Sequence, residues 1–413
     1  MIKFDTFTLI NGLRFVVHHD ANTPIVAMNI LYKVGARDEH PEKTGFAHLF
    51  EHLMFGGSIN IPRYDEPLQR AGGDNNAFTN SDITNYYLTL PKENIETAFW
   101  LESDRMLSLA FSEKSFEVQR QVVVEEFRQN YLNQPYGDAW LLLKPLAYST
   151  HPYQWNTIGK EISHIEQATL EDVKDFYGRF YNPNNAIIAI AGDISTEEVK
   201  QLAEKWFASI PAGPEISRSL PSEPIQKEAR KLHVKKQVPV DGIYKAWHMC
   251  GRNDDDYYAT DLISDLLGSG QSSRLVKALI KKQELFAEIS AFITGDSDPG
   301  LFVVTGKLLP GISFDAAEEG INQQIAILKQ KSPSMDELRK VKNRVVSGQA
   351  FSSISVLSKA MNLAYYTYLG DTDLVNNLTK QYRKVQAADI IRIANNIFTE
   401  NNCSTLYYTK END

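Results

Sequence analysis

Two histidines and one glutamate lie within five residues, in the run His48-Leu49-Phe50-Glu51-His52. If this run is helical, His48 and His52 lie one turn apart on one face and can bind one metal ion, with Zn–N distances of about 2.0 to 2.1 Å. Glu51 falls on nearly the same face, where a carboxylate can accept a proton from water activated by the metal. The spacing therefore predicts a zinc site with Glu51 as the general base.

The side chains around this run favour a metal over a chance grouping of polar residues on an amphipathic helix. The flanking residues are apolar: Phe46, Ala47, Leu49, Phe50, Leu53, Met54 and Phe55. A helix of this kind packs into a core, so His48, Glu51 and His52 cannot all reach solvent. Buried imidazoles and carboxylates need partners, and a metal ion supplies one.

A zinc site needs a third protein ligand. The other histidines of the first half are isolated in the sequence and are expected to be ordinary surface or packed residues: His18, His19, His40, His151 and His164. The pair Glu125-Glu126 follows three valines in a predicted helix, where a carboxylate is costly unless it is paired or coordinating. Helical phase alone does not choose between Glu125 and Glu126.

Periodicity predicts the elements that position these residues. A hairpin turning at Asn11-Gly12, a third strand and a helix are expected in order over 7–19, 25–34 and 43–55. A strand over 85–90 and amphipathic helices over 92–109 and 115–131 come next. The first half is expected to close with a helix over 170–180 and a strand over 186–191.

The second half repeats this plan. Residues 172–176 and 184–187 match residues 389–393 and 401–404 at a constant offset of 217, which indicates an internal duplication rather than a short-period solenoid. Prolines punctuate a polar stretch between the halves. We therefore predict an α+β fold of two homologous sandwich halves, each a sheet covered by helices. The predicted ranges are an N-terminal zinc-binding catalytic domain over 1–210, a linker over 211–228 and a homologous C-terminal domain without metal ligands over 229–413.

Composition limits the class of protein. The 413 residues are 43% hydrophobic and 23% charged, as in globular proteins, and the net charge of -9 argues against binding to nucleic acid or to anionic membranes. Two distant cysteines, Cys250 and Cys403, exclude a disulfide framework. The N-terminal residues lack the pattern of a secretory signal, so we expect a cytoplasmic location, or a periplasmic one if an export signal has been removed.

Several motifs together resemble the pitrilysin-type (inverzincin) zinc peptidases. They are Asn11-Gly12-Leu13-Arg14, the run from Gly35 to Glu39, the run from Gly45 to Phe55, Asn133 to Gly137, Tyr181 to Asn185 and Gly192-Asp193. The pattern is most similar to the branch of mitochondrial processing peptidase and small bacterial processing proteases, and it covers essentially the whole chain as two halves.

The resemblance implies roles for further residues. Matching Val122 to Gln129 to the family's segment puts Glu126 in the place of the third zinc ligand and leaves Glu125 as a neighbour. The run from Asp74 to Asn80 resembles the family's edge strand, to which a peptide substrate adds as an extra strand. Substrate binding is therefore expected at Asn76, Ala77, Phe78 and Thr79, although the run by itself reads as an ordinary turn and strand.

Two departures from the family pattern are visible. Gln119, seven residues before Glu126, stands where many relatives carry a glutamate that supports the zinc site from outside the ligand set. Relatives also carry an arginine and a tyrosine in the C-terminal half that hold the substrate carbonyl, and the matching positions here are Ile280 and Ala287. The second departure leads us to the hypothesis that a homologous partner chain without the zinc motif supplies the arginine and tyrosine. A misalignment of a few residues is the alternative explanation.

The sequence thus predicts a zinc-dependent endopeptidase with one Zn²⁺ per chain that cleaves short or unfolded peptides. It is expected to be the zinc-carrying subunit of a two-chain enzyme, or else a homodimer. Two other functions stay open, a non-catalytic scaffold subunit of a complex and a maturation protease dedicated to one peptide.

Overall fold

The computed structural model describes residues 1–411 and divides the chain into two compact units. Unit 1 contains residues 1–128, 155–220 and 350–377. Unit 2 contains residues 129–154, 221–349 and the end of the chain from 378. Neither unit is a continuous stretch of sequence, so each is described below by itself.

Unit 1 is built on a six-stranded mixed sheet with the order β1-β2-β6-β3-β5-β4. In that order the strands are Asp5–Thr8, Arg14–His19, Ala186–Gly192, Ile25–Tyr32, Thr84–Pro91 and Asp74–Thr79. The predicted hairpin at Asn11-Gly12 is present as the antiparallel pair β1–β2, and β2 pairs with β6 in parallel. β6 is buried along its whole length, and β4 forms one edge of the sheet.

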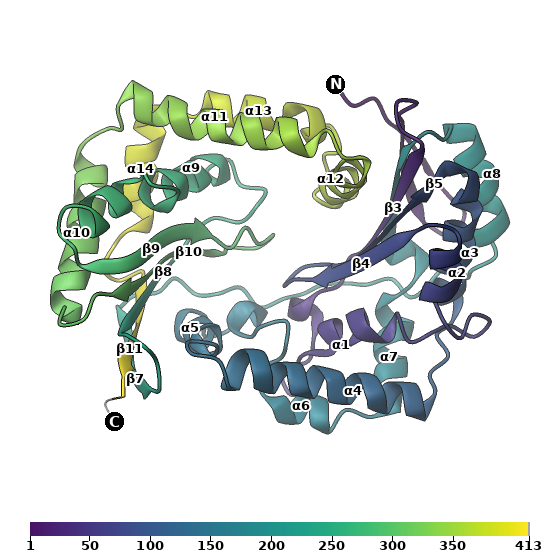
Figure 1. The fold of residues 1–413 in the computed structure, drawn as a ribbon, viewed down its shortest axis with the longest axis horizontal. Coiled ribbons are helices and arrows are strands. Elements are labelled where there is room, and N and C mark those ends of the chain that lie inside the picture. Colours follow the sequence, from purple (N-terminus) through teal and green to yellow (C-terminus); the bar gives the residue numbers. More distant parts are fainter. Residues whose placement is uncertain (412–413) are drawn as a thin grey trace. The chain divides into compact units, whose positions relative to one another are not determined.

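Helices cover both faces of this sheet. The helices of unit 1 are α1 (Phe46–Leu53), α2 (Asp65–Arg70), α3 (Ile95–Leu107), α4 (Glu113–Phe127), α6 (Ile162–Glu166), α7 (Leu170–Phe180), α8 (Thr196–Phe207) and α12 (Val356–Tyr368). In Figure 1, α12 lies on one side of the unit 1 sheet, and α3 and α8 lie on the other. α1 contacts β4, β5, α4 and α7, so the predicted metal-binding helix lies beside the edge strand.

Unit 2 has a five-stranded sheet with the order β7-β11-β8-β10-β9. In that order the strands are Arg230–Lys236, Cys403–Lys410, Gly242–His248, Leu301–Leu308 and Phe286–Ile293. Its helices are α5 (Ala139–Ala147), α9 (Tyr257–Gly268), α10 (Phe314–Gln330), α11 (Met335–Ser352, whose last residues enter unit 1), α13 (Leu374–Lys384, whose first residues belong to unit 1) and α14 (Ala387–Ile397).

The two sheets share one topology. The order β2-β6-β3-β5-β4 of unit 1 recurs as β7-β11-β8-β10-β9, and in both sheets only the first of these pairs is parallel. β6 and β11 begin 217 residues apart, as do α7 and α14. The predicted α+β class and internal duplication are therefore confirmed.

One pair of equivalent helices is exchanged between the halves of the sequence. α5 comes from the first half of the chain but packs on β8 and β11, where Leu143 and Ala147 join the core with Val303 and Leu406. α12 comes from the second half but packs on β3 and β6. The two helices also begin 217 residues apart, so each half supplies the helix that covers the other half's sheet.

This exchange separates the compact units from the predicted domain ranges. The predicted ranges 1–210 and 229–413 describe the duplicated halves of the sequence, and as domain boundaries they stay a prediction. The compact units are different, because residues 129–154 of the first half belong to unit 2 and residues 350–377 of the second half belong to unit 1. A helical pattern shows which face is buried but not which sheet receives it. Residues 211–228 form no helix or strand, as expected of the linker. None of the helices in residues 1–411 combines the length and apolar character needed to cross a membrane.

The exchange predicts how the protein behaves when it is cut in the linker between residues 214 and 215. Each fragment alone lacks the helix that covers its sheet, so fragments 1–214 and 215–413 expressed singly should be poorly soluble, because each exposes a large apolar face. Expressed together, they should co-purify as a folded one-to-one pair, measured by gel filtration and thermal melting.

Leu363, which is fully buried on α12, provides the matched variant for this experiment. Leu363→Asp in the second fragment should abolish pairing, because a charge would enter the apolar layer above β3 and β6. The exposed Gln330→Asp on α10 should leave pairing intact. Independent folding of fragment 1–214 would contradict the exchange.

Candidate metal centre

α1 is held in place by its apolar residues, which leave its histidines on one face. Phe46, Ala47, Leu49, Phe50 and Leu53 are buried, whereas the histidines are only partly covered. The rings of His48 and His52 lie 4.9 Å apart between centroids, at 85° to each other. The predicted helix thus presents two imidazoles side by side, as the spacing requires.

Glu126 of α4 joins these imidazoles. Its Oε2 lies 3.7 Å from Nε2 of His48 and 3.5 Å from Nε2 of His52, and the three ligand atoms lie within 4.8 Å of one another. Glu125 is exposed and lies 3.9 Å from Arg128. Within residues 1–411, no other group of three or more His, Cys, Asp or Glu side chains converges in this way.

The arrangement fits a zinc ion. Two imidazole nitrogens and one carboxylate oxygen are a donor set that zinc accepts, with a fourth position left for water or substrate. Burial lowers the pKa of His48, although the Glu126 carboxylate acts in the opposite direction. A lowered pKa favours the neutral imidazole, which is the form that binds a metal. Nδ1 of His48 is buried without a hydrogen-bond partner in the described part of the chain, so this side of the ring holds no competing contact.

The other predicted histidines have separate contacts. His18 Nδ1 lies 2.7 Å from the Lys3 carbonyl, and His164 Nδ1 lies 2.8 Å from the Thr44 hydroxyl. His19 pairs with Asp193, and His151 lies 3.5 Å from Asp298. The Glu42 amide donates to Nδ1 of His40. Each therefore behaves as the packed or surface histidine that the sequence led us to expect.

Glu51 and Gln119 lie on the same two helices as the converging residues. Glu51 is partly buried beside His52, and it forms no hydrogen bond or ion pair within residues 1–411. Gln119 is partly buried on α4, two turns before Glu126 and thus on the same face of the helix.

A buried carboxylate that the sequence analysis gave no role fixes the start of α1. The Glu39 side chain accepts the amide hydrogens of Gly45 and Ala47, one on each oxygen, both at 2.8 Å. Burial raises the pKa of Glu39 to about 8, and the two amide donors oppose that rise. These amides belong to the first turn of α1, where backbone N–H groups lack helical partners. Glu39 therefore anchors the turn that carries His48.

The N-cap of α1 needs a glycine. Gly45 has φ of 91°, and a Cβ atom there would lie 2.7 Å from the Ile158 carbonyl oxygen. Further along α1, the Phe50 ring stacks on Phe176 and Tyr181, and its carbonyl accepts the Tyr86 hydroxyl at 3.2 Å. Contacts at its start and middle therefore fix the rotation of α1 about its own axis.

α4 is anchored separately. Arg120 donates to the carbonyl of Glu166, the last residue of α6, and to the carbonyl of Ala168, which follows α6. Arg128 pairs with the Glu166 carboxylate at 2.7 Å. A guanidinium satisfies carbonyls that a helix end leaves free. Arg120 and Arg128 lie on either side of Glu126 in the sequence. Their contacts with the end of α6 therefore fix the helix turn that carries Glu126.

The predicted substrate strand is the edge strand β4. Asn76, Ala77, Phe78 and Thr79 pair with β5 on one side, and no strand of the described chain pairs on the other. The Asn76 side chain accepts the Ala77 amide hydrogen at 2.8 Å. A free strand edge beside α1 is a place where an extended peptide can add.

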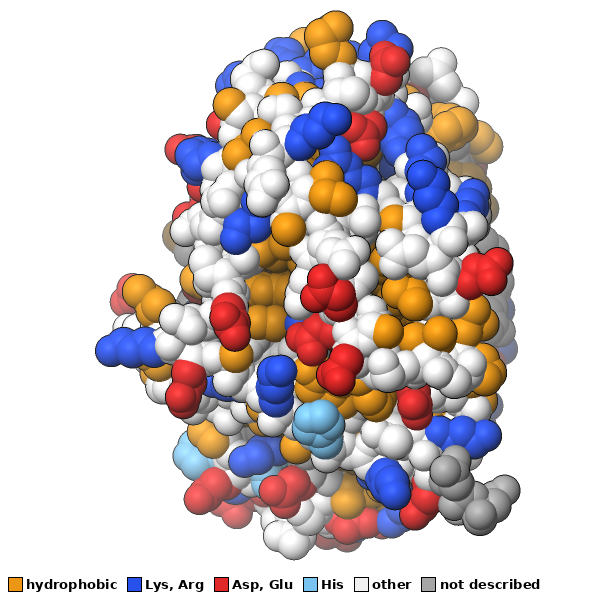
Figure 2. Space-filling model, turned by 90° about the vertical axis from the view of Figure 1, so that its left-hand side faces the viewer, with side chains coloured by type: hydrophobic (Ala, Val, Ile, Leu, Met, Phe, Trp, Pro, Cys, Tyr) orange, Lys and Arg blue, Asp and Glu red, His pale blue; other side chains and the backbone are white. Residues whose placement is uncertain are grey.

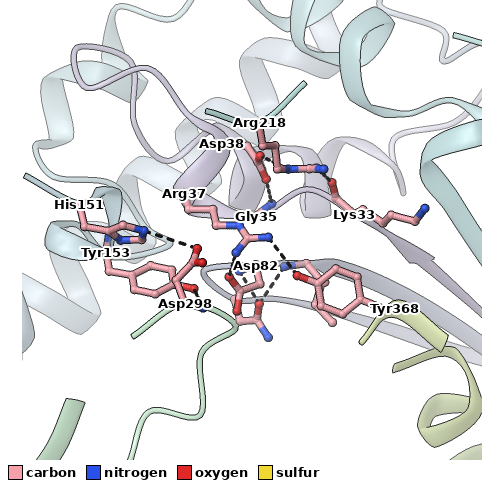
Figure 3. Close-up of polar contacts among 12 residues, drawn as sticks. Lys33, Gly35, Arg37, Asp38, Asp82, His151, Tyr153, Arg218, Asp298 and Tyr368 are labelled. Carbon is pink, nitrogen blue, oxygen red and sulfur yellow. Dashed lines mark hydrogen bonds and ion pairs between the residues drawn. The ribbon is translucent and has the colours of Figure 1, made fainter. Parts of the chain in front are cut away.

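An ion pair fixes the turn that follows β4. Arg37 lies 2.8 Å from the Asp82 carboxylate, and it donates to the Tyr368 hydroxyl of α12 at 3.0 Å (Figure 3). The backbone adds to this, because the Arg37 amide donates to the Ser81 carbonyl. The loop before α1, the turn after β4 and α12 are thus linked.

Comparison with known proteins places this chain in a family. Residues 14–150 match the family described as Insulinase (Peptidase family M16), and residues 167–345 match the one described as Peptidase M16 inactive domain. The chain is 32% identical to the zinc protease PqqE of Helicobacter pylori, over 98% of this chain and 92% of that protein. The chain belongs to the M16 peptidase family.

Other relatives agree with this M16 assignment. A probable mitochondrial-processing peptidase subunit beta of Arabidopsis thaliana is 24% identical, over 75% of this chain and 58% of that protein. The crystal structure of a protease from Helicobacter pylori has a TM-score of 0.93 and 30% identity, over 99% of this chain and all of that one. The predicted resemblance is thus confirmed at the level of the M16 family. His48, Glu51, His52 and Glu126 all fall in the part matched to the Insulinase description.

The anchoring role of Glu39 gives a test in this M16 chain. In Glu39→Gln the amide can accept only one of the two N–H groups, and the buried unpaired group should cost about 1 to 3 kcal/mol. Because the first turn of α1 then shifts, zinc affinity should fall about tenfold or more. Thermal melting of the metal-free protein and competition with a chelator measure the two effects.

The exposed Glu42→Gln, three residues away, is the matched control and should change neither quantity. Equal behaviour of the two variants would show that Glu39 does not position α1.

Proposed function

We propose that this chain is a zinc-dependent endopeptidase of the HxxEH type that cleaves short or unfolded peptides. The observation that carries the proposal is the convergence of His48, His52 and Glu126, with Glu51 on the same helix and without a partner in the described chain. Zinc proteases among the relatives support the metal, and the M16 family supports peptide substrates.

In this proposal His48, His52 and Glu126 would hold one zinc ion per chain. Bound there, zinc supplies a Lewis acid for a peptide carbonyl and for water. Glu51 takes the proton of the attacking water and passes it to the leaving amine. Asn76 to Thr79 bind the peptide backbone by strand addition, which tolerates many substrate sequences.

The role of Glu51 is tested by Glu51→Gln. The variant should keep its fold and about one zinc per chain, because the three converging side chains remain, while peptide cleavage should fall by about 10² to 10⁴. Zinc content by mass spectrometry and cleavage of a fluorescent peptide library measure both. Normal turnover by this variant would show that another group is the base.

The third ligand is tested in the same assay. Glu126→Gln should lose zinc, whereas Glu125→Gln should retain both zinc and activity, because Glu125 points to solvent beside Arg128. The opposite result would move the third ligand to Glu125.

We further propose that this chain is the zinc-carrying subunit of a two-chain enzyme. Ile280 lies at the end of a short helical segment, and Ala287 is exposed on β9. Neither side chain can donate the hydrogen bonds that the arginine and tyrosine of relatives supply. A homologous partner chain that carries the arginine and tyrosine would complete the substrate site. The mitochondrial-processing peptidase relatives are named as subunits, which supports a divided enzyme.

If the substrate site is divided between two chains, the purified chain should bind zinc but cleave peptides slowly. Adding a homologous chain that carries the arginine and tyrosine should raise kcat/KM at least about tenfold, because each charged or hydroxyl donor contributes roughly 1 kcal/mol or more to the transition state. The same partner chain with its arginine and tyrosine replaced by alanine and phenylalanine is the control. Full turnover by the unmodified chain alone would refute the division.

Experiments can distinguish two other functions from the proposed one, a scaffold subunit and a maturation protease. A scaffold subunit is favoured only by the description of residues 167–345 as an inactive domain, and it requires no metal. A maturation protease dedicated to one peptide would cleave few members of a peptide library. The expected cytoplasmic location stays a prediction.

A further inference from the structure

Unit 2 contains a cavity of about 460 Å³ between α10 and the β7-β11-β8 part of its sheet. Figure 2 views the molecule from the side on which α10 lies, and hydrophobic side chains are visible there in hollows between charged ones. The volume lies in the range of roughly 300 to 1,000 Å³ that is usual for small-molecule sites. All of its lining residues belong to unit 2, and none is part of the candidate metal centre.

A buried ion pair forms one wall of the cavity. Lys245 of β8 is 3% exposed, and its ammonium group bonds the Glu318 carboxylate of α10. The Tyr407 hydroxyl donates to the other Glu318 oxygen at 2.6 Å, and Lys231 lies 4.0 Å from that same oxygen. Burial opposes ionisation of Glu318, yet the bonds from Lys245 and Tyr407 lower its pKa. Both oxygens of this carboxylate are thus already engaged.

The charged side chains that line the cavity carry a surplus of positive charge, because Lys231, Lys245 and Lys329 outnumber Glu318 and Glu400. Lys231 lines the cavity with its side chain 54% exposed, so a ligand can reach its ammonium group. Trp247 is only 3% exposed and lines the cavity, and its indole N–H donates no hydrogen bond within residues 1–411. An ammonium group has three donor hydrogens and an indole has one, and neither accepts. A ligand that satisfies them must bring acceptor oxygens.

The remaining wall is apolar. Ile325 and Phe398 are each 5% exposed and line the cavity with Trp247, whose ring meets Phe398 edge-on at 5.2 Å. An aromatic or branched group placed there would be removed from water on most sides.

We propose that this cavity binds a small amphipathic carboxylate. Its carboxylate group faces Lys231, Lys245 and the Trp247 N–H, and its aromatic or branched alkyl group packs on Ile325 and Phe398. Free aromatic acids and the C-terminal residue of a peptide share this chemistry.

The experiment titrates the full-length, metal-free chain with 3-phenylpropionate by calorimetry and Trp fluorescence. Metal is removed first with a neutral chelator, because carboxylates also bind zinc. Saturable one-site binding is expected, with Kd of about 1 mM or lower. The corresponding amide, 3-phenylpropionamide, should bind at least about tenfold more weakly, since it lacks the charge that the ammonium groups recognise.

Paired variants locate the binding. Lys231→Ala should weaken binding about tenfold, and Ala326→Trp, which fills the mouth of the cavity from an exposed position, should abolish it. The matched controls are Lys235→Ala on the same strand and Gln330→Trp one turn further along α10, and both should bind normally. Absence of saturation, equal binding of acid and amide, or equal loss in variants and controls would overturn the proposal.

Two further titrations with a peptide distinguish a peptide C-terminus from a free aromatic acid as the natural ligand. A pentapeptide ending in phenylalanine is compared as the free acid and as the C-terminal amide. Tighter binding of the free-acid peptide than of 3-phenylpropionate assigns the cavity to peptide C-termini, and weaker binding assigns it to free aromatic acids.

Discussion

The structure as a whole depends on how α1 is oriented. This helix must bury its apolar face in the core and keep the side chains of His48, Glu51 and His52 outside that core. Apolar packing alone would leave the helix free to rotate or slide by a fraction of a turn. Glu39 at its start and Phe50 against Tyr181 and Tyr86 remove that freedom. The geometry of the candidate metal centre is therefore determined as much by these buried contacts as by the histidines themselves, since a displacement of about 1 Å can cost a site about a hundredfold in rate.

The third converging residue adds a second constraint, because Glu126 belongs to a different helix. α1 and α4 pack against each other. Arg120 and Arg128 also bond Glu166 of α6, and these bonds fix α4 independently of any metal. The duplicated half has the same framework, yet α9 contains no histidine, and no comparable cluster occurs among the described residues of unit 2. Both halves thus keep the same order of strands and helices, but among the described residues only the first half has a group of side chains that could bind a metal.

Sequence patterns predicted what is local. The hairpin at Asn11-Gly12, the helix carrying His48 and the repeat at an offset of 217 all follow from short-range spacing, and the structure contains them. The choice of Glu126 over Glu125 required the family resemblance, because helical phase alone did not separate adjacent residues. The anchoring by Glu39 and the exchange of α5 and α12 were missed. Both depend on which distant backbone a residue meets, and neither periodicity nor composition carries that information.

The exchange explains how the second half, which has no comparable donor cluster among its described residues, contributes to the structure around the candidate metal centre. α12 comes from the second half, yet it covers the sheet that ends in β4. Tyr368 on that helix bonds Arg37, and Arg37 in turn pairs with Asp82 in the turn after β4. The edge strand beside α1 is therefore supported by a residue that a separate N-terminal half would lack. On this reasoning the second half contributes to the geometry of unit 1 through the covering helix, without contributing a ligand.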